Sequence, residues 1–225
     1  MARFYSRFVG RNDLVFDIGA NRGNRIEVFL ALGARVVAAE PQPRCIEHLR
    51  KVYGRRADVE LVEKALGARE GASTMMLSEN DMISSLNPQW IERARASGRF
   101  DGYEWNGRVQ VDMTTLDGLI SNYGTPRFVK IDVEGLEDEV LEGLSTPVPA
   151  VSFEYTPEFI ESAIRSADRL SSLGSYEFNY SEGESLRMAL RNDVDEQKLV
   201  KHLEGLSRKK GAVSGDVYAF CREEH

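Results

Sequence analysis

A short apolar strand that runs into a glycine-bearing loop most constrains how this chain can fold. The strand covers residues 14–18 and is apolar except for Asp17. Gly19 and Gly23 then mark a tight turn, and helical spacing of apolar residues begins at about Ile26. A strand, a glycine loop and a helix N-terminus in this order bring backbone N–H groups close to a ligand. The stretch therefore predicts a binding loop of the kind found in parallel α/β sheets.

An acid at the tip of the next strand indicates what the ligand contains. The second strand, residues 35–39, ends at Glu40, which lies 23 positions after Asp17. An acidic side chain in this position is placed to accept hydrogen bonds from a ribose diol. The two strands together therefore predict a nucleoside-containing ligand.

The glycine spacing distinguishes between nucleoside cofactors. A dinucleotide loop has a middle glycine that lets the backbone approach a pyrophosphate, and here Asn21 takes that place between Gly19 and Gly23. The carboxylate of Asp17 would repel a pyrophosphate but suits the sulfonium and ammonium groups of S-adenosylmethionine. We therefore expect S-adenosylmethionine as cofactor, and a nicotinamide-dependent oxidoreductase is the alternative.

Composition and charge exclude several classes of protein. The 225 residues carry a formal net charge of −7, which disfavours a nucleic-acid substrate because phosphates normally meet clusters of lysine and arginine. No apolar run approaches the roughly 18 residues of a membrane span, and the N-terminal residues lack the apolar core of a secretory signal. Two distant cysteines are most simply reduced thiols. We expect a cytoplasmic protein with one domain over residues 1–225.

Alternating strand and helix patterns indicate an α/β domain with a mainly parallel sheet. Apolar runs predict sheet strands at 14–18, 35–39, 59–62, 128–133, 150–154, 176–180 and 217–221. Residues 74–77 and 108–113 alternate as antiparallel strands do. We expect a helical insert at about 181–212.

Two segments depart from this rhythm. Residues 78–107 contain both tryptophans but no clear core strand, which predicts either a helical cap or a lid whose aromatic rings contact the acceptor. The first eleven residues place three arginines among aromatic residues. We expect their apolar side to dock on the domain, and a membrane-surface role is the alternative.

Charged residues gather near the end of the apolar strand at 128–133. Lys130, Asp132 and Glu134 alternate there, so they would share one direction, and Glu154 ends the following strand. Ligands in open α/β sheets bind outside these C-terminal strand ends. The three carboxyl groups are therefore candidates for catalysis, and a structural Lys–Asp pair is the alternative for the first two residues.

Six sequence blocks carry a resemblance to a known family. In chain order they are VFDIGANRGN, AAEPQPRCIEHL, VEKALG, SSL at 84–86, TTLDGLI at 114–120 and VKIDVEGLEDEVLEGL at 129–144. This pattern resembles the FkbM family of S-adenosylmethionine-dependent methyltransferases over about residues 13–155. The resemblance implies the class I methyltransferase fold: a Rossmann-like, seven-stranded, mainly parallel sheet with helices on both faces and an antiparallel terminal hairpin. It also implies O-methylation of a hydroxyl on a sugar or small natural product.

The resemblance also implies roles for individual residues. The residues expected around the methionine part of the cofactor are Asp17, Gly19, Ala20, Asn21 and Gly23. Glu40 is expected at the ribose, with Pro41 and Gln42 beside the adenosine and with Lys64 and Ala65 at the adenine. Asp132 and Glu134 are expected near the methyl group and the acceptor.

The residues leave the mechanism open. Asp132, Glu134 and Glu154 are the candidate catalytic residues, with Glu134 favoured as the base and Asp132 as the group that orients it. A divalent metal held by these carboxylates is the alternative, although we predict no metal site. A cofactor-binding domain without catalysis is a further alternative. The expected partner is a small hydroxyl-bearing acceptor, with no nucleic acid and no membrane span.

Overall fold

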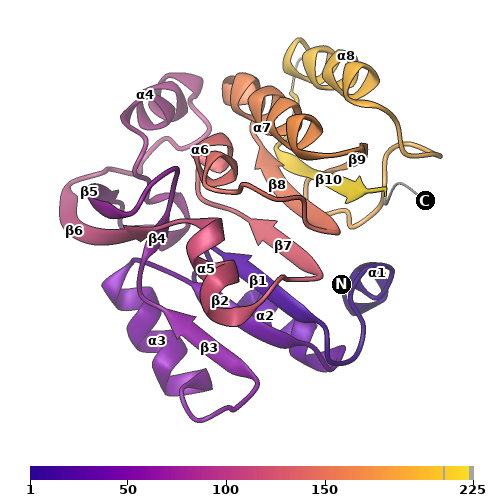
Figure 1. Ribbon diagram of the computed structural model, residues 1–225. Helices are drawn as coiled ribbons and strands as arrows, with labels where there is room; N and C mark the ends of the chain where they lie inside the picture. Colours follow the sequence, from indigo (N-terminus) through magenta and orange to yellow (C-terminus); the bar gives the residue numbers. More distant parts are fainter. Residues whose placement is uncertain (210, 223–225) are drawn as a thin grey trace.

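Residues 1–209 and 211–222 are described in the computed structural model of the chain, and seven of their strands form the main sheet (Figure 1). The spatial order is β3–β2–β1–β7–β8–β10–β9. Their bounds are β1 Leu14–Ile18, β2 Arg35–Ala39, β3 Val59–Val62, β7 Phe128–Ile131, β8 Ala150–Tyr155, β9 Tyr176–Glu182 and β10 Gly215–Cys221. Only β10 runs antiparallel to its neighbours, β8 and β9. The chain reverses its direction of winding between β1 and β7, which is where open α/β sheets bind ligands.

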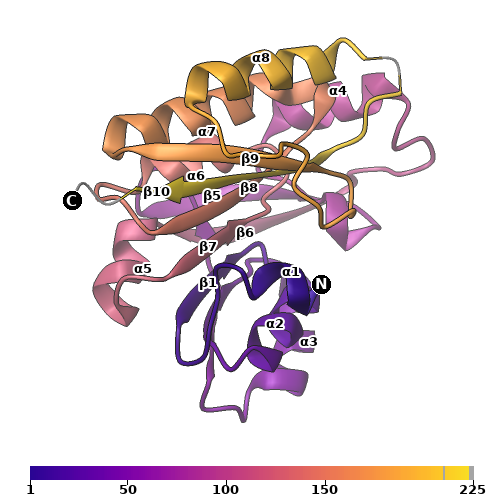
Figure 2. The ribbon, with the colours of Figure 1, turned by 90° about the vertical axis from the view of Figure 1, so that its right-hand side faces the viewer.

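Helices cover both faces of this sheet because each strand alternates its side chains between two apolar cores. One core joins the sheet to α1 (Ala2–Tyr5), α2 (Asn24–Ala31) and α3 (Pro43–Tyr53). The other joins it to α5 (Leu116–Tyr123), α6 (Glu137–Glu142), α7 (Ile160–Leu173) and α8 (Glu196–Ser207). Figure 2 shows α1, α2 and α3 on one side of the sheet and α7 and α8 on the other. The fold is the expected α/β sandwich with an antiparallel terminal hairpin.

A smaller sheet stands beside the C-terminal strand ends. It consists of β4 (Ala65–Leu66), β6 (Gly107–Thr114) and β5 (Gly71–Leu77), in that spatial order. The pairing of β5 with β6 is antiparallel, as the alternation of their residues indicates. Between them the chain forms the 3-10 turn η1 (Asp81–Ile83) and helix α4 (Pro88–Ser97). The segment 78–107 therefore has ordered local structure of its own.

Three aromatic residues of that segment, Trp90, Phe100 and Trp105, build a separate small core rather than an open aromatic wall, whereas Tyr103 is exposed. Trp90 and Trp105 are buried and meet edge to face, with ring centroids 6.4 Å apart. The indole N–H of Trp105 donates to the carbonyl oxygen of Ile83 at 2.6 Å. Phe159, from the 3-10 turn η2 (Pro157–Phe159) before α7, completes the cluster. These contacts fix the segment against the body of the domain.

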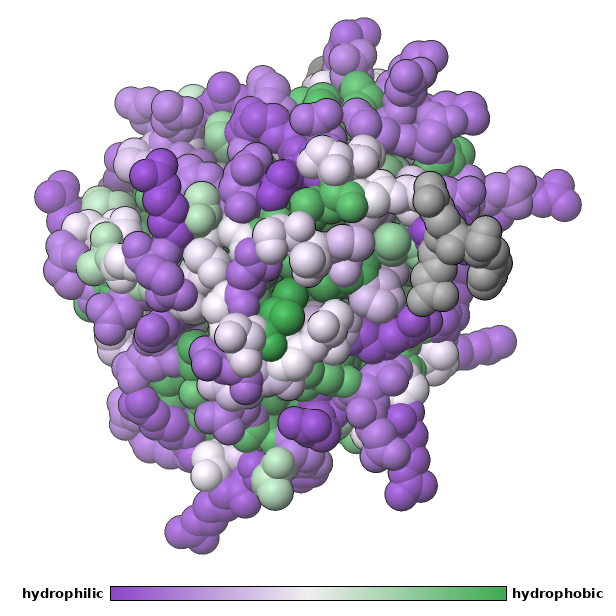
Figure 3. Space-filling model, in the orientation of Figure 1, coloured by the Kyte–Doolittle hydropathy of each residue, from purple (hydrophilic) through white to green (hydrophobic). Residues whose placement is uncertain are grey.

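The N-terminal residues dock on the domain itself. Phe4, Tyr5 and Phe8 are buried in the core on the α2 side, and the rings of Phe4 and Tyr218 lie 5.1 Å apart. The apolar side of this segment is therefore not available to a membrane, which confirms the expected docking. No helix within residues 1–209 and 211–222 has both the length and the apolar character that crossing a bilayer requires. The face in Figure 3 is mostly hydrophilic, with small apolar areas toward its centre.

Two differences from the expected elements bear on function. β7 ends at Ile131, two residues earlier than the apolar run predicts, so the residues that follow form a turn rather than a strand. The expected insert at 181–212 contains α8, preceded by an irregular segment, 183–194, that folds back along β9. Residue 210 of that insert and residues 223–225 of the expected domain lie outside the described residues.

Candidate active site

A pocket opens at the C-terminal ends of β1, β2 and β7, where the sequence places the cofactor. Most of the expected binding residues line it: Asp17, Gly19, Ala20, Asn21, Glu40, Pro41, Lys64, Ala65 and Asp132. Gly23 is the exception, since it packs against Tyr53 behind the loop and begins α2. The pocket therefore gathers residues that lie more than a hundred positions apart.

The glycine loop packs directly against the chain that follows β7. Gly19 has φ +80°, and a Cβ atom there would lie 1.8 Å from the carbonyl oxygen of Asp132. The amide of Asp132 in turn donates to the carbonyl oxygen of Ile18 at 2.9 Å. Gly19 is thus required for close approach of two backbones, because any side chain would separate the two halves of the site.

Glu40 is held in place by the backbone on both sides of the pocket. Its Oε2 accepts from the amide of Asn21 and its Oε1 from the amide of Gln42, both at 2.8 Å. Burial raises the pKa of Glu40 to about 7, and these two amides oppose that rise. Each carboxylate oxygen can accept a second hydrogen bond, so both remain able to bind a diol.

Asp17 carries an unsatisfied acceptor in the same pocket. The residue is 2% exposed, and its Oδ2 has no hydrogen-bond partner among the described residues. Burial raises the pKa of Asp17 to about 7, while the charges of Lys130 and Arg25 oppose the rise. An orphaned buried carboxylate oxygen calls for a cationic or donating ligand group. The ammonium group of S-adenosylmethionine fits this requirement, and a pyrophosphate does not.

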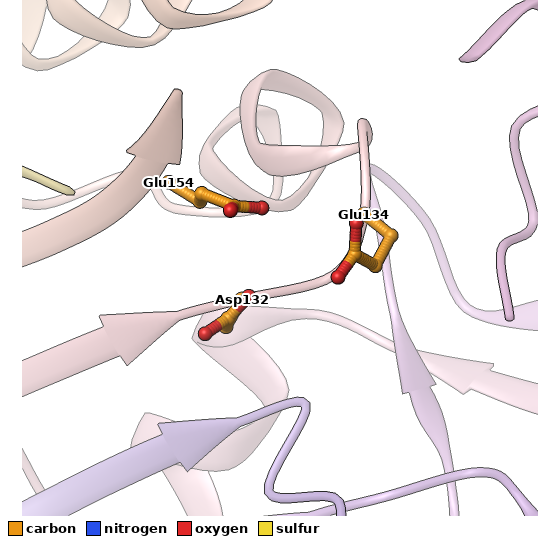
Figure 4. Close-up of side chains that lie close together, drawn as sticks. All are labelled: Asp132, Glu134 and Glu154. Carbon is orange, nitrogen blue, oxygen red and sulfur yellow. The ribbon is translucent and has the colours of Figure 1, made fainter. Parts of the chain in front are cut away.

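Three carboxyl groups meet beside the pocket. The side chains of Asp132, Glu134 and Glu154 bring one oxygen each within 4.8 Å of one another. Figure 4 shows Glu154 approaching from the end of β8, while Asp132 and Glu134 follow β7. Desolvation and the negative charges of the neighbouring acids raise the pKa of Glu134 and that of Glu154 well above their usual range. Such a cluster can hold a proton or a cation.

The turn that presents Glu134 is supported by Glu137 and Ser85, which were not among the expected site residues. Glu134 has φ +56°, an uncommon conformation for a residue with a side chain. Glu137 accepts from the amides of Val133 and Gly135, both at 3.2 Å, and Ser85 donates to the carbonyl oxygen of Glu134 at 2.7 Å. The signal for Glu137 lay in the block IDVEGLE, where an acid follows the glycine at the start of a helix.

Lys130 supports the site from behind instead of lining it. Its side chain is 1% exposed, and Nζ lies 3.1 Å from an oxygen of Asp132 and 3.0 Å from one of Asp216 on β10. The Lys–Asp pair given as the alternative for the first two residues is therefore present, while β7 ends at Ile131, so strand alternation does not set the directions of Asp132 and Glu134. Lys130 therefore compensates the charge of buried Asp216 and of partly exposed Asp132.

The segment 78–107 contributes to the pocket through residues in and just after η1. Asp81, Met82, Ser84 and Leu86 line it. The aromatic residues of the segment, Trp90, Phe100, Tyr103 and Trp105, were expected to contact an acceptor, but they do not line the pocket. The carbonyl oxygen of Asp81 accepts from the side-chain amides of Asn21 and Gln42, at 3.2 and 3.0 Å. An oxygen of its carboxylate lies 2.6 Å from Arg22. The segment is thus tied to the glycine loop.

A parallel sheet in this order, with a reversed last strand and a pocket at the switch point, defines the class I fold of S-adenosylmethionine-dependent methyltransferases. The chain is similar to the solved structure of precorrin-6y C5,15-methyltransferase from Geobacter metallireducens GS-15, with 11% identity and a TM-score of 0.53 over 98% of this chain and 87% of that one. It also matches a TehB-like methyltransferase from Corynebacterium glutamicum, with 9% identity and a TM-score of 0.48 over 98% and 86% of the two chains. A putative rRNA-methylase from Clostridium thermocellum matches with 10% identity and a TM-score of 0.45 over 100% and 94%. The fold itself follows from the strand order and the position of the pocket, without the TehB-like protein or the rRNA-methylase.

The family follows from the sequence itself. The methyltransferase FkbM domain model matches residues 17–199, and the chain belongs to this family. No curated protein matches the chain significantly. The protein is thus a methyltransferase that uses S-adenosylmethionine, and the resemblance found in the sequence blocks is confirmed.

Proposed function

We propose that the protein transfers a methyl group to a hydroxyl of a sugar or another small natural-product acceptor. The observation that supports this is the meeting of Asp132, Glu134 and Glu154 beside the pocket. An alcohol is a poor nucleophile at neutral pH, so a carboxylate that takes its proton as the bond forms contributes roughly 10²–10⁴-fold to the rate. Holding the acceptor oxygen in line with the methyl carbon supplies the remainder.

The proposed cofactor contacts use residues already described. When bound, S-adenosylmethionine supplies a methyl group that its sulfonium has activated. Glu40 would accept from the ribose hydroxyls, since both of its oxygens retain acceptor capacity. The unsatisfied oxygen of Asp17 would pair with the ammonium group. Lys64 and Ala65 would border the adenine ring.

Glu134 is the proposed base. It lines the pocket, whereas Glu154 lies behind it and is not among the lining residues. Desolvation and the nearby acids raise the pKa of Glu134, which makes its ionised carboxylate a stronger base. Asp132, which is paired with Lys130, would orient the acceptor hydroxyl toward Glu134. Glu154 would share the proton that Glu134 removes.

The charges around the pocket favour an acceptor without phosphate groups. Six acids line it: Asp17, Glu40, Asp81, Asp132, Glu134 and Glu184. Among the lining cations, Arg22 pairs with Asp81, and Arg25 pairs with Glu184 through two contacts of 2.9 Å. Lys64 also lines the pocket but is the residue proposed to border the adenine, so it is not placed to meet the acceptor. Phosphate recognition needs uncommitted arginine or lysine side chains. A neutral polyhydroxylated acceptor therefore fits better than a nucleic acid.

We also propose that residues 78–107 form a cap that borders the acceptor. The support is the position of Met82, which lines the pocket and is 66% exposed, so its side chain is available to contact a bound acceptor. We further propose, as expected from the sequence, that the chain forms a single domain and acts in the cytoplasm.

Two measurements test the proposed function. Calorimetry with S-adenosylhomocysteine and with NAD separates a methyltransferase from an oxidoreductase, and we expect saturable binding of S-adenosylhomocysteine alone. A methyl-transfer screen against nucleotide sugars, oligosaccharides and hydroxylated metabolites then identifies the acceptor. Transfer to RNA with none to hydroxylated small molecules would overturn the proposed acceptor class. Binding without transfer to any acceptor would favour a non-catalytic domain.

A further inference from the structure

A second hollow lies at the edge of the main sheet, away from the cofactor pocket. It is bordered by the residues after α1, the outermost strand β9, the segment 183–194 and the end of β10. In Figure 2 the segment that leaves β9 descends toward α1. The charged residues around the hollow are Arg7, Arg187, Arg191, Arg222, Glu177 and Asp193. Four guanidinium groups thus face two carboxylates, on a chain whose net charge is −7.

The two carboxylates are already committed to one of the arginines. Arg222 donates through Nε to Glu177 at 2.8 Å, and a terminal nitrogen lies 3.7 Å from Asp193. Arg7, Arg187 and Arg191 make no ion pair with any residue in 1–209 or 211–222. Three exposed cations are therefore held around one hollow without a counter-charge.

The backbone that carries two of these arginines is firmly anchored. Asn179 on β9 is buried, and its amide nitrogen donates to the carbonyl oxygen of Leu190 at 3.1 Å and to Asp193 at 2.9 Å. Its oxygen accepts from the amide of Leu190 at 3.0 Å. A two-way backbone bridge between Phe178 and Val194 closes the segment. Arg187 and Arg191 thus project from a loop whose backbone is held in place, so binding need not order that backbone and its entropic cost is lower.

We propose that this hollow binds a small ligand through a phosphoryl group. A guanidinium fork matches phosphate oxygens with paired hydrogen bonds, and a phosphoryl group carries about −1.5 to −2 charges near neutral pH. That charge matches the two positive charges that remain in the hollow after Glu177 and Asp193 are counted. A concave site suits a small ligand better than a flat membrane surface, and the nearby apolar residues Phe4 and Phe8 are buried. This site is independent of the proposed acceptor.

Calorimetric titration with inorganic pyrophosphate tests the proposal. The double variant Arg187→Gln/Arg191→Gln removes two cations whose side chains are exposed, so the fold should be retained, as a thermal melt verifies. We expect wild type to bind saturably and the double variant to bind at least about tenfold more weakly, because it loses two charge-assisted contacts. The matched control Arg108→Gln/Arg127→Gln removes two exposed arginines elsewhere and should bind like wild type.

Three results would overturn the proposal. The first is the absence of saturable pyrophosphate binding by wild type at low salt. The second is an equal loss in the control variant, which would show that overall charge and not the hollow attracts the anion. The third comes from sedimentation with phosphatidylcholine vesicles that contain or lack phosphatidic acid. Binding to the phosphatidic acid vesicles with none to pyrophosphate would assign the hollow to a lipid surface instead of a small ligand.

Discussion

Replacing Glu40 by alanine tests the central contact of the proposed cofactor site. The carboxylate of Glu40 is 2% exposed and lies between two loops, with one oxygen bound to the amide of Asn21 and the other to that of Gln42. Glu40→Ala removes the proposed acceptor of the ribose diol and also releases both amides. The variant should therefore affect affinity and stability together.

The size of the two effects follows from the contacts. Buried ribose hydroxyls without an acceptor cost about 1–3 kcal/mol, which weakens binding by about 5- to 150-fold. Two hydrogen bonds to a charged acceptor contribute about 3–6 kcal/mol to folding, but the buried carboxylate opposes this, since burial raises its pKa to about 7. The loss of stability should therefore be smaller than those bonds alone suggest.

Calorimetric titration with S-adenosylhomocysteine at neutral pH measures the affinity, and thermal unfolding reports the stability. Glu60→Ala is the matched control, because Glu60 is an exposed acid on β3 and should change neither quantity. Glu40→Gln keeps one acceptor oxygen and should fall between wild type and Glu40→Ala. A folded Glu40→Ala variant with the affinity of wild type would refute the ribose contact and the reasoning built on it.

Three further predictions concern the proposed base Glu134, the cofactor-binding residue Asp17 and the turn after β7. Glu134→Gln should lower turnover by about 10²-fold or more while S-adenosylhomocysteine affinity changes little. If EDTA abolishes wild-type activity and Mg²⁺ or Mn²⁺ restores it, the carboxylates hold a metal instead of acting as a base. Affinity for S-adenosylhomocysteine should fall about tenfold from pH 8 to pH 6, because Asp17 has a pKa raised to about 7 and only its ionised form pairs with the ammonium group. The variant Asp17→Asn should show a flatter dependence of affinity on pH. An equally steep dependence in that variant would contradict the assignment of Asp17. The same raised pKa means that the folded protein without cofactor binds the proton more tightly, so this group makes stability fall as pH rises from about 4 to about 7. Gly135→Ala should lower the melting temperature, since its Cβ would lie 2.4 Å from Trp90 at φ +93°, whereas Gly205→Ala in α8 meets no atom within 4 Å and should be neutral or stabilising.

The sequence by itself determined the sheet class and the cofactor side of the pocket. Short-range patterns carry this information, because apolar runs, glycine positions and an acid at a strand tip act within one βαβ unit. Asp17, Gly19 and Glu40 could therefore be predicted, and the pocket contains all three. The antiparallel hairpin followed from two late apolar runs together with the family resemblance.

Only the tertiary structure decided which distant side chains meet. The sequence placed Glu154 at the same edge of the sheet as Asp132. The approach of their carboxyl oxygens to within 4.8 Å depended on the pairing of β7 with β8, which no spacing in the chain specifies. The burial of the Lys130 side chain also depends on its ion pair with Asp216, which lies on a strand more than eighty residues further along the chain. Burial of the tryptophans likewise depended on where α4 docks, because an aromatic residue in a loop-like segment fits a core or a binding wall equally well until its neighbours are known.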